Sequence, residues 1–283
     1  GGSMKYSIGT TSRLGNRHIN QDRFDIIERS DSVLLVMADG MGGHKGGEIA
    51  AEVACQTAAN AFNQEKFPIS DTPSFLKKLV LQCQSEIIKS GLDHAPEIEP
   101  KTTLILCLIQ QGEVVWAHVG DSRLYVIREE VILEHTLDHS SVERLYQLGQ
   151  ISEQEKNTHP SRHMVTQCMG SRNKPPRPSL SGVVSLRPHD VLLLCSDGFW
   201  GQLQARDIKS GFSQHDMDLC LNTLAEKAET NAYPKSDNIS AIALRWISDK
   251  DVRVDSFGDN EYQDLLDSVA DINRAVDEIQ KQG

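Results

Sequence analysis

The sequence lacks the features that mark disulfide-rich, membrane-spanning and nucleic-acid-binding proteins. Its six cysteines form no C-x-x-C pair and lie mostly inside apolar runs, which argues against a zinc site or a disulfide framework. No apolar run approaches the roughly 20 residues of a membrane-spanning helix, and no apolar signal region follows Met4. Lys and Arg are outnumbered, and the net charge of −11 argues against a nucleic-acid partner. We therefore expect a cytoplasmic protein with reduced cysteines and no membrane contact.

The composition that remains is that of an ordinary globular protein. The 283 residues are 39% hydrophobic and 24% charged, enough for one large domain or two small ones. Residues 1–3, Gly-Gly-Ser before Met4, have the character of a tag remnant and are left out of the fold prediction. The surplus of carboxylates is compatible with cation binding, although a solvated acidic surface is its commoner cause.

Several short apolar runs predict strands. Val33 to Ala38 is continuously apolar, as in a strand that is buried on both faces. Six further runs are predicted strands: Thr102 to Ile109, Val114 to Val119, Arg123 to Ile127, Val183 to Leu186, Val191 to Cys195 and Ile239 to Trp246. The turns between the first three of these six are too short for helical crossovers, so these strands should pair antiparallel.

Amphipathic helices are predicted beside the strands. Glu48 to Phe62 and Phe75 to Lys89 each carry an apolar face, and Asp216 can cap a third helix. We expect an α+β fold in which two packed antiparallel sheets are flanked by helices, an α-β-β-α sandwich. Residues 140–160 contain two capping-box spacings, starting at Ser140 and Ser152, and predict a small helical excursion.

Four aspartates stand at predicted strand ends, where carboxylates could gather around a cation. Asp39 follows the first buried strand and precedes glycines, which let a backbone carbonyl approach an ion. Asp197 ends a second strand, Asp237 precedes a third, and Asp121 lies in a turn between two more. Any one of them could be an ordinary turn aspartate, but four together favour a site for a hard divalent cation. Arg17 supplies an opposite charge that could bind a phosphate.

The motifs occur in a distinctive order. R-x-x-N-x-D, D-G-M-G-G-H-x-x-G-E, G-D-S-R, D-H-S, S-D-G and D-N run from Arg17 to Asn238. This order resembles the metal-dependent serine/threonine protein phosphatases of the 2C type, most closely their bacterial members. The resemblance covers nearly all of the chain up to Ser248 and implies the same α-β-β-α sandwich.

The resemblance also implies a metal centre that holds Mn²⁺ or Mg²⁺, as two ions or three. Asp39 would bridge two metals, and the carbonyl of Gly40 would bind one of them. Asp197 and Asp237 would complete the other. Asp121, together with Asp197, matches the positions that hold a third metal in bacterial relatives.

Three further residues take roles from the resemblance. Arg17 would hold the substrate phosphate, Asp22 would orient a water molecule, and His44 would act as the general acid. The match departs from the animal enzymes at Gln21, where some members have glutamate, and at His44, which comes three residues later than their histidine. A packing or loop role for His44 is an equal alternative. Residues 140–160 match the flap beside the active site.

The expected reaction is the hydrolysis of phosphoserine and phosphothreonine in proteins, with a Ser/Thr kinase as a plausible partner. One alternative is a metal nuclease or a small-molecule phosphoesterase, and the acidic composition argues against a nuclease. The other is a non-catalytic family member that binds phosphoproteins. That alternative expects lost metal ligands, whereas Asp39, Asp197 and Asp237 are all present.

Residues 249–283 have a different character and lie outside the predicted catalytic domain of residues 4–248. They carry ten acidic and four basic residues, a net charge of −6. Apolar residues recur there every three or four positions: Tyr262, Leu265, Val269, Ile272, Val276 and Ile279. This spacing predicts an amphipathic helix that docks on the catalytic body or on a partner, with self-pairing as the second alternative, and that is not needed for chemistry.

Overall fold

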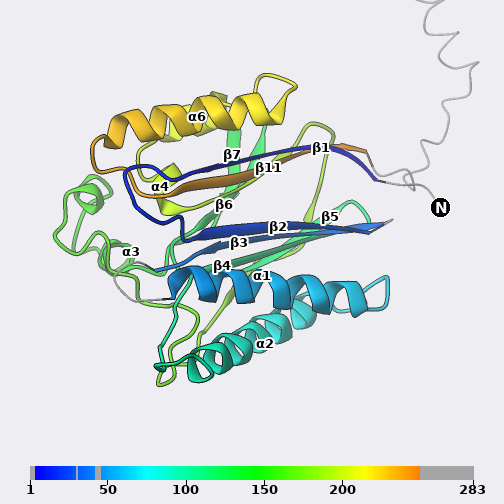
Figure 1. The fold of residues 1–283 in the computed structure, drawn as a ribbon. Helices are drawn as coiled ribbons and strands as arrows, with labels where there is room; N and C mark the ends of the chain where they lie inside the picture. Colours follow the sequence, from blue (N-terminus) through cyan, green and yellow to red (C-terminus); the bar gives the residue numbers. More distant parts are fainter. Residues whose placement is uncertain (1–3, 30, 42–45, 249–283) are drawn as a thin grey trace, which may run out of the picture.

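The structure is a computed structural model that describes residues 4–29, 31–41 and 46–248. The residues predicted as a tag remnant and as the acidic tail lie outside this range. Two mixed-length antiparallel sheets stack face to face (Figure 1). The first sheet has the order β1 (Lys5–Arg13), β11 (Ile239–Ser248), β10 (Val191–Cys195), β6 (Arg123–Arg128), β7 (Val131–His135). The second has the order β2 (Asp22–Arg29), β3 (Ser32–Asp39), β4 (Leu104–Gln110), β5 (Glu113–Val119), β8 (Ser179–Leu180), and β9 (Val184–Ser185) also pairs with β5.

The two sheets bury a shared apolar layer between them. On β3, Val33, Leu35 and Met37 face the other sheet, where they pack in one cluster with Leu192 and Leu244. The alternate β3 residues pack instead in the cluster that lies under the helices. Successive side chains of a strand point to opposite faces, so the continuous apolar run is explained by burial on both sides.

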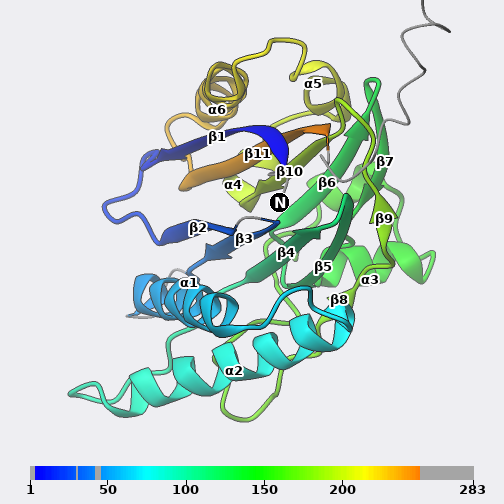
Figure 2. The ribbon, with the colours of Figure 1, turned by 90° about the vertical axis from the view of Figure 1, so that its right-hand side faces the viewer.

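Helices cover the outer face of each sheet (Figures 1 and 2). α1 (Gly47–Gln64) and α2 (Thr72–Leu92) lie on the sheet that contains β3. α4 (Asp197–Trp200), α5 (Ala205–Ser210) and α6 (Met217–Ala232) lie on the sheet that contains β11. The predicted α-β-β-α sandwich is therefore confirmed. Asp216 caps α6 as predicted, because its carboxylate accepts a hydrogen bond of 3.1 Å from the Leu219 N–H.

Four strands were not predicted from the sequence: β1, β2, the edge strand β7 and the two-residue strand β8. In β1 only Gly9 and Thr11 are buried, so the strand lacks the apolar alternation that would reveal it. Gly9 is needed because a Cβ there would lie 2.5 Å from the backbone nitrogen of Asp218, where α6 begins. The missing side chain thus lets α6 pack directly on the strand.

The helical excursion predicted at residues 140–160 is present as α3 (Ser141–Gln147) and the 3₁₀ helix η1 (Gln154–Asn157). Ser140 accepts a hydrogen bond of 3.3 Å from the Glu143 N–H, which confirms the predicted cap. The capping box is incomplete, because the Glu143 carboxylate binds the Gln147 amide and the Lys156 ammonium instead. No helix in the described ranges combines the length and the apolarity needed to cross a membrane.

Candidate metal centre

The predicted metal residues meet at one edge of the two sheets, on the left of Figure 1. Asp39 ends β3 and stands opposite Asp22, the first residue of β2, in the antiparallel register. In the other sheet, Cys195 at the end of β10 stands opposite Arg123, the first residue of β6. Asp197 follows β10 after Ser196, and Asp121 lies two residues before the start of β6. The same edge therefore receives carboxylates from both sheets.

The electrostatics of this edge show that the carboxylates lie close together. Removal from water raises the pKa of Asp39 well above its usual value, and the charges of Asp22 and Asp197 raise it further. Burial also raises the pKa of Asp121, with Asp197 adding to the effect. The pKa of Asp197 is raised by burial and by the charge of Asp237. The described part of the site therefore has an excess of negative charge that a bound cation would offset.

Asp22 is the clearest sign that a positive group belongs here. It is only 3% exposed, and neither carboxylate oxygen has a hydrogen-bond donor among the described residues. Burial raises its pKa to about 6, the nearby Asp39 carboxyl and Ser240 hydroxyl partly oppose this rise, and the charges of Asp197 and Asp237 add to it. An ionised carboxylate without a partner is costly to bury, so this residue fits a site completed by a cation and its water molecules.

The backbone around Asp39 is fixed by its neighbours. The Asp39 N–H donates to the Thr103 hydroxyl at 3.0 Å, and the Asp39 carbonyl accepts from the Thr103 N–H at 3.0 Å. At Gly40 a Cβ would lie 2.3 Å from the carbonyl oxygen of Gly47, so no other residue fits. The turn that starts α1 therefore packs against the peptide of Gly40, the residue whose carbonyl is the predicted ligand.

No three His, Cys, Asp or Glu side chains in the described ranges already converge as a closed ligand set. This is compatible with Mg²⁺ or Mn²⁺, which take oxygen ligands, including backbone carbonyls and several water molecules, and need few side chains for each ion. The residues fit hard divalent cations better than zinc, which prefers nitrogen and sulfur ligands.

Arg17 lies at the rim of this edge. Its guanidinium Nε is 3.4 Å from a carboxylate oxygen of Asp237, and the two side chains are 54% and 41% exposed. Asn238 holds the segment that carries Arg17, because its side chain accepts from the Gln21 N–H at 3.0 Å and donates to the carbonyls of Leu14 and Ile19. The D-N motif thus positions the R-x-x-N-x-D motif across the sheet edge.

A family model described as Protein phosphatase 2C matches residues 9–235. The chain belongs to the protein phosphatase 2C family. The fold and the family expected from the motifs are therefore confirmed, and with them the expectation of a metal-dependent phosphatase.

Relatives of similar length support the assignment to protein phosphatase 2C. The serine/threonine phosphatase stp of Listeria monocytogenes is 30% identical over 242 residues, covering 83% of this chain and 93% of the relative. The protein phosphatase PhpP of Streptococcus pneumoniae is 30% identical over 252 residues, covering 86% and 98%.

Solved structures show the same fold. The serine/threonine phosphatase Stp1 of Staphylococcus aureus superposes with a TM-score of 0.79 at 30% identity, covering 88% of this chain and 97% of that one. The catalytic domain of the phosphatase PstP, solved in complex with 2 manganese ions, has a TM-score of 0.71 at 25% identity and covers 86% and 99%.

Within this phosphatase 2C fold, the residues that hold Asp121 were not predicted from the sequence. Arg123 makes two hydrogen bonds to the Asp138 carboxylate, at 2.8 and 2.7 Å, and a third to the Tyr125 hydroxyl at 3.1 Å. Its guanidinium lies 3.4 Å from the centre of the Trp200 ring, and the Trp200 N–H donates to the Asp121 carbonyl at 2.9 Å. Arg123 belongs to the G-D-S-R motif and Asp138 to the D-H-S motif, so the sequence offered a signal for these two residues. Trp200 belongs to none of the motifs and offered no such signal.

The motifs depart from those of the animal enzymes at Gln21 and His44, and the structure describes only the first of these residues. The Gln21 side-chain amide donates to the Glu48 carboxylate at 3.2 Å, so it links the residue before β2 to α1. His44 falls on residues 42–45, outside the described residues. In the described part, His163 is the histidine whose charge affects Asp197: burial and Asp237 raise the pKa of Asp197, and His163 opposes them.

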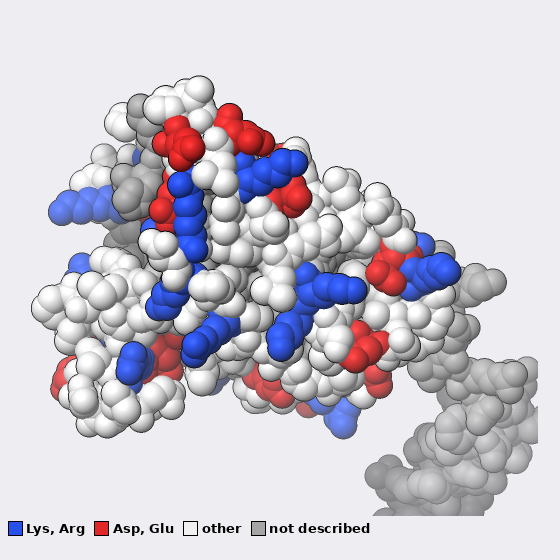
Figure 3. Space-filling view, turned by 90° about the horizontal axis from the view of Figure 1, so that it is seen from below, with Lys and Arg blue, Asp and Glu red and all other residues white. Residues whose placement is uncertain are grey.

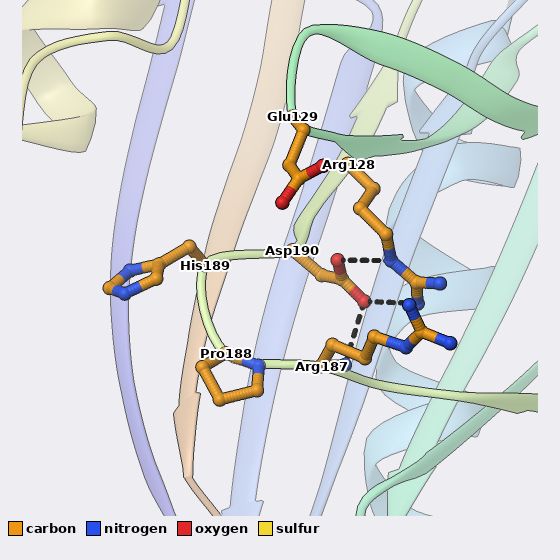
Figure 4. Close-up of a pocket in the computed structure, with 6 residues that line it drawn as sticks. All are labelled: Arg128, Glu129, Arg187, Pro188, His189 and Asp190. Atoms are coloured by element: carbon orange, nitrogen blue, oxygen red, sulfur yellow. Dashed lines mark hydrogen bonds and ion pairs between the residues drawn. The ribbon is translucent and has the colours of Figure 1, made fainter.

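A hollow lies at the ends of β6 and β10 that are opposite to the metal edge (Figure 4). There the buried Asp190 accepts two hydrogen bonds of 2.8 Å from Arg128 and one of 2.8 Å from the Arg187 N–H. β10 has five residues, and at about 3.3 Å each this puts the hollow roughly 16 Å from the metal edge. The arrangement fixes the connection between β9 and β10, which lie in different sheets, and takes no part in the metal centre.

Proposed function

We propose that the chain hydrolyses phosphoserine and phosphothreonine in proteins, with Mn²⁺ or Mg²⁺ as the cofactor. Asp39 and the Gly40 carbonyl would hold one ion, and Asp39, Asp197 and Asp237 another. Asp121 and Asp197 would hold a third. The observation that carries this proposal is the buried Asp22, whose two oxygens lack any donor in the described residues beside these carboxylates.

The bound cations would lower the pKa of a coordinated water molecule, so that it can attack phosphorus near neutral pH. Asp22 would accept a hydrogen bond from the attacking water and orient it, because its oxygens are otherwise unused. Arg17 would bind two oxygens of the phosphate with its guanidinium fork and offset their charge. His44 is the proposed donor of the proton that the leaving serine or threonine oxygen needs.

The contact between Arg17 and Asp237 gives this arrangement an order of events. Without a bound cation, the negative charge of Asp237 attracts the Arg17 guanidinium, which lies 3.4 Å away. A cation held by Asp237 would compensate that charge and weaken its hold on Arg17. More than half of the Arg17 side chain is exposed, so it could then turn to a substrate phosphate. Phosphate affinity at Arg17 should therefore increase once the metal is bound.

The remaining parts of the chain have supporting roles in this proposal. Residues 4–248 would form the catalytic domain, and residues 140–160 would be its flap. Residues 249–283 would form an amphipathic helix that docks in cis or on a partner protein. The phosphoprotein substrates would be cytoplasmic, and a Ser/Thr kinase that adds the same phosphates would be the opposing enzyme.

A comparison of substrates and metals tests the proposal. Purified protein is incubated with a phosphothreonine peptide, with nucleotides and with an aryl phosphate, with Mn²⁺, Mg²⁺ or a chelator. We expect peptide turnover in Mn²⁺ or Mg²⁺, none in chelator and little on nucleotides. An Asp39→Asn variant should be inactive on every substrate. Faster turnover of nucleotides than of the peptide would contradict the proposal, and so would full activity in chelator.

A further inference from the structure

A short loop rich in basic residues and proline, residues 171–178, lies next to the metal edge. It reads S-R-N-K-P-P-R-P and carries Arg172, Lys174 and Arg177, all of them exposed. The proposed chemistry assigns no role to these cations. In Figure 1 the loop is the yellow-green segment below α1, beside the end of α2.

The first end of the loop is tied to the backbone that carries Asp39. Met169 and Thr102 exchange two backbone hydrogen bonds, of 2.8 and 3.2 Å. Thr102 in turn forms a bridge with Gly40, and the next residue, Thr103, bonds both ways to Asp39. The loop therefore starts two residues after a strand-like contact with the metal turn.

The second end is tied to the backbone that carries Asp121. Ser179 follows the loop, and its hydroxyl is 2.8 Å from Nε2 of His139. The other ring nitrogen of His139 accepts a hydrogen bond of 3.0 Å from the N–H of Gly120, the residue before Asp121. The two ends of the loop are thus joined to the two metal-bearing segments, one from each sheet.

The middle of the loop is hydrogen-bonded to residues 166 and 167, which precede the loop in the chain. The Lys174 ammonium donates to the Thr166 carbonyl at 2.7 Å, and the Arg177 N–H donates to the Gln167 side chain at 3.3 Å. Thr166 itself donates to the His139 carbonyl at 2.8 Å. Three prolines restrict the backbone further, so the backbone of the loop has little entropy to lose on binding.

Two of the charges on this rim have no counter-ion. Arg172 pairs with Glu97 at 3.4 Å and Lys101 pairs with Glu99 at 3.6 Å, but Lys174 and Arg177 enter no ion pair with a described residue. Figure 3 views the molecule from this underside and shows a row of Lys and Arg side chains along its left part. In a chain with a net charge of −11, uncompensated cations beside a catalytic edge indicate a partner of opposite charge.

We propose that residues 171–178 bind acidic side chains that flank the phosphorylated residue of the substrate, with Lys174 and Arg177 as the contacts. The inference rests on the proposed function and names its substrate class: phosphopeptides with Asp or Glu beside the phosphoresidue. Lys174 acts as a point charge, and Arg177 can bind a carboxylate with two parallel hydrogen bonds.

The test compares two phosphothreonine peptides that differ only in charge. One carries Asp and Glu on both sides of the phosphothreonine, and the other carries Asn and Gln at the same positions. The measured quantity is the ratio of the two kcat/KM values, in Mn²⁺ at low salt. Because each enzyme is its own reference, general losses of activity cancel from the ratio.

The key variant is Lys174→Glu/Arg177→Glu, and the matched control is Arg206→Glu/Lys209→Glu on the exposed side of α5, which has the same change of charge. Exposed charge contacts are individually weak, but reversing two of them should lower the ratio about fivefold to thirtyfold. The control should keep the wild-type ratio. Raising the salt concentration should shrink the preference of the wild type. If the Glu variant does not fold, Lys174→Gln/Arg177→Gln should show about half the effect on a logarithmic scale.

The possible results distinguish a failure of this inference from a failure of the proposed function. A wild-type enzyme that turns over both peptides equally would overturn the inference while the proposed function stands, and so would a wild-type ratio in the Lys174 and Arg177 variants. An equal loss in the α5 control would also overturn it, by showing that only total charge matters. Turnover of an aryl phosphate without turnover of either peptide would instead refute the proposed function.

Discussion

Replacing Asp22 by Asn should make the metal-free protein more stable near neutral pH, although it removes a residue of the proposed site. Asp22 is 3% exposed and its pKa is raised from the usual 3.8 to about 6 by burial and by nearby carboxylates. A pKa raised in the folded state means that folding favours the protonated form. The stabilising effect is therefore complete below pH 3.8 and is lost as the pH rises through about 6.

The size of this stability difference follows from the rise in the pKa of Asp22. Two pKa units correspond to about 3 kcal/mol, so the folded protein at pH 7.5 carries a penalty of about this size relative to strongly acidic solution. Asparagine does not ionise and avoids the penalty. For a domain of this length each kcal/mol changes the Tm by about 2–4 °C, so Asp22→Asn should raise the Tm in chelator by about 6–12 °C.

Calorimetric unfolding between pH 5 and 8 in EDTA measures this directly. The wild-type Tm should fall across that range more steeply than the variant Tm, and Asp93→Asn at the exposed end of α2 serves as the matched control. Saturating Mn²⁺ should narrow or reverse the difference, since the cation supplies the missing counter-charge. An Asp22→Asn protein that in EDTA at pH 7.5 is no more stable than the wild type, and that follows the same pH dependence, would contradict this prediction.

Four further predictions concern the site and the tail. Asp39→Asn should lower kcat by on the order of 10²-fold or more and weaken Mn²⁺ binding in calorimetry, and unchanged metal affinity would contradict its assignment. Arg17→Ala should weaken inhibition by inorganic phosphate more than it weakens Mn²⁺ binding, whereas the opposite order would place Arg17 on the metal side. Arg123→Ala should weaken the binding of the least tightly held Mn²⁺, because Arg123 fixes both Asp138 and the Trp200 ring that binds Asp121; Arg123→Lys should rescue it only in part. A chain that ends at Ser248 should hydrolyse an aryl phosphate at near the full-length rate, and a folded truncation without turnover would show that the tail belongs to the active domain.

The parts of the fold that were predictable are those in which local pattern and tertiary environment agree. Val33 to Ala38 was recognisable because the strand is apolar on both faces, and Asp216 because a helix start needs its cap. β1 was not recognisable, because its burial comes from a close contact with α6 at Gly9 and not from apolar side chains. Tertiary contact of this kind leaves no periodic signal in the strand itself.

The same distinction applies to the site. Asp39, Asp121, Asp197 and Asp237 could be named from their places at strand ends, and the register of the two sheets brings these ends to one edge. The support around Asp121 could not be named, because the stacking of Trp200 on a guanidinium joins residues 77 positions apart. Nothing near Trp200 in the sequence indicates which cation it will meet.

Burial of β3 on both faces has a consequence for how the sheet finds its alignment. In a strand with one wet face, sliding by a single residue exposes the apolar side chains, and the cost of that exposure selects the correct pairing. β3 has no wet face, so sliding exchanges one apolar set for another. What distinguishes the correct alignment is the polar end of the strand, where Asp39 meets Asp22 and bonds to Thr103. The residues proposed to serve catalysis therefore also determine the pairing register of β3. Substitutions there should increase the fraction of mispaired sheet during folding as well as lower the rate of catalysis.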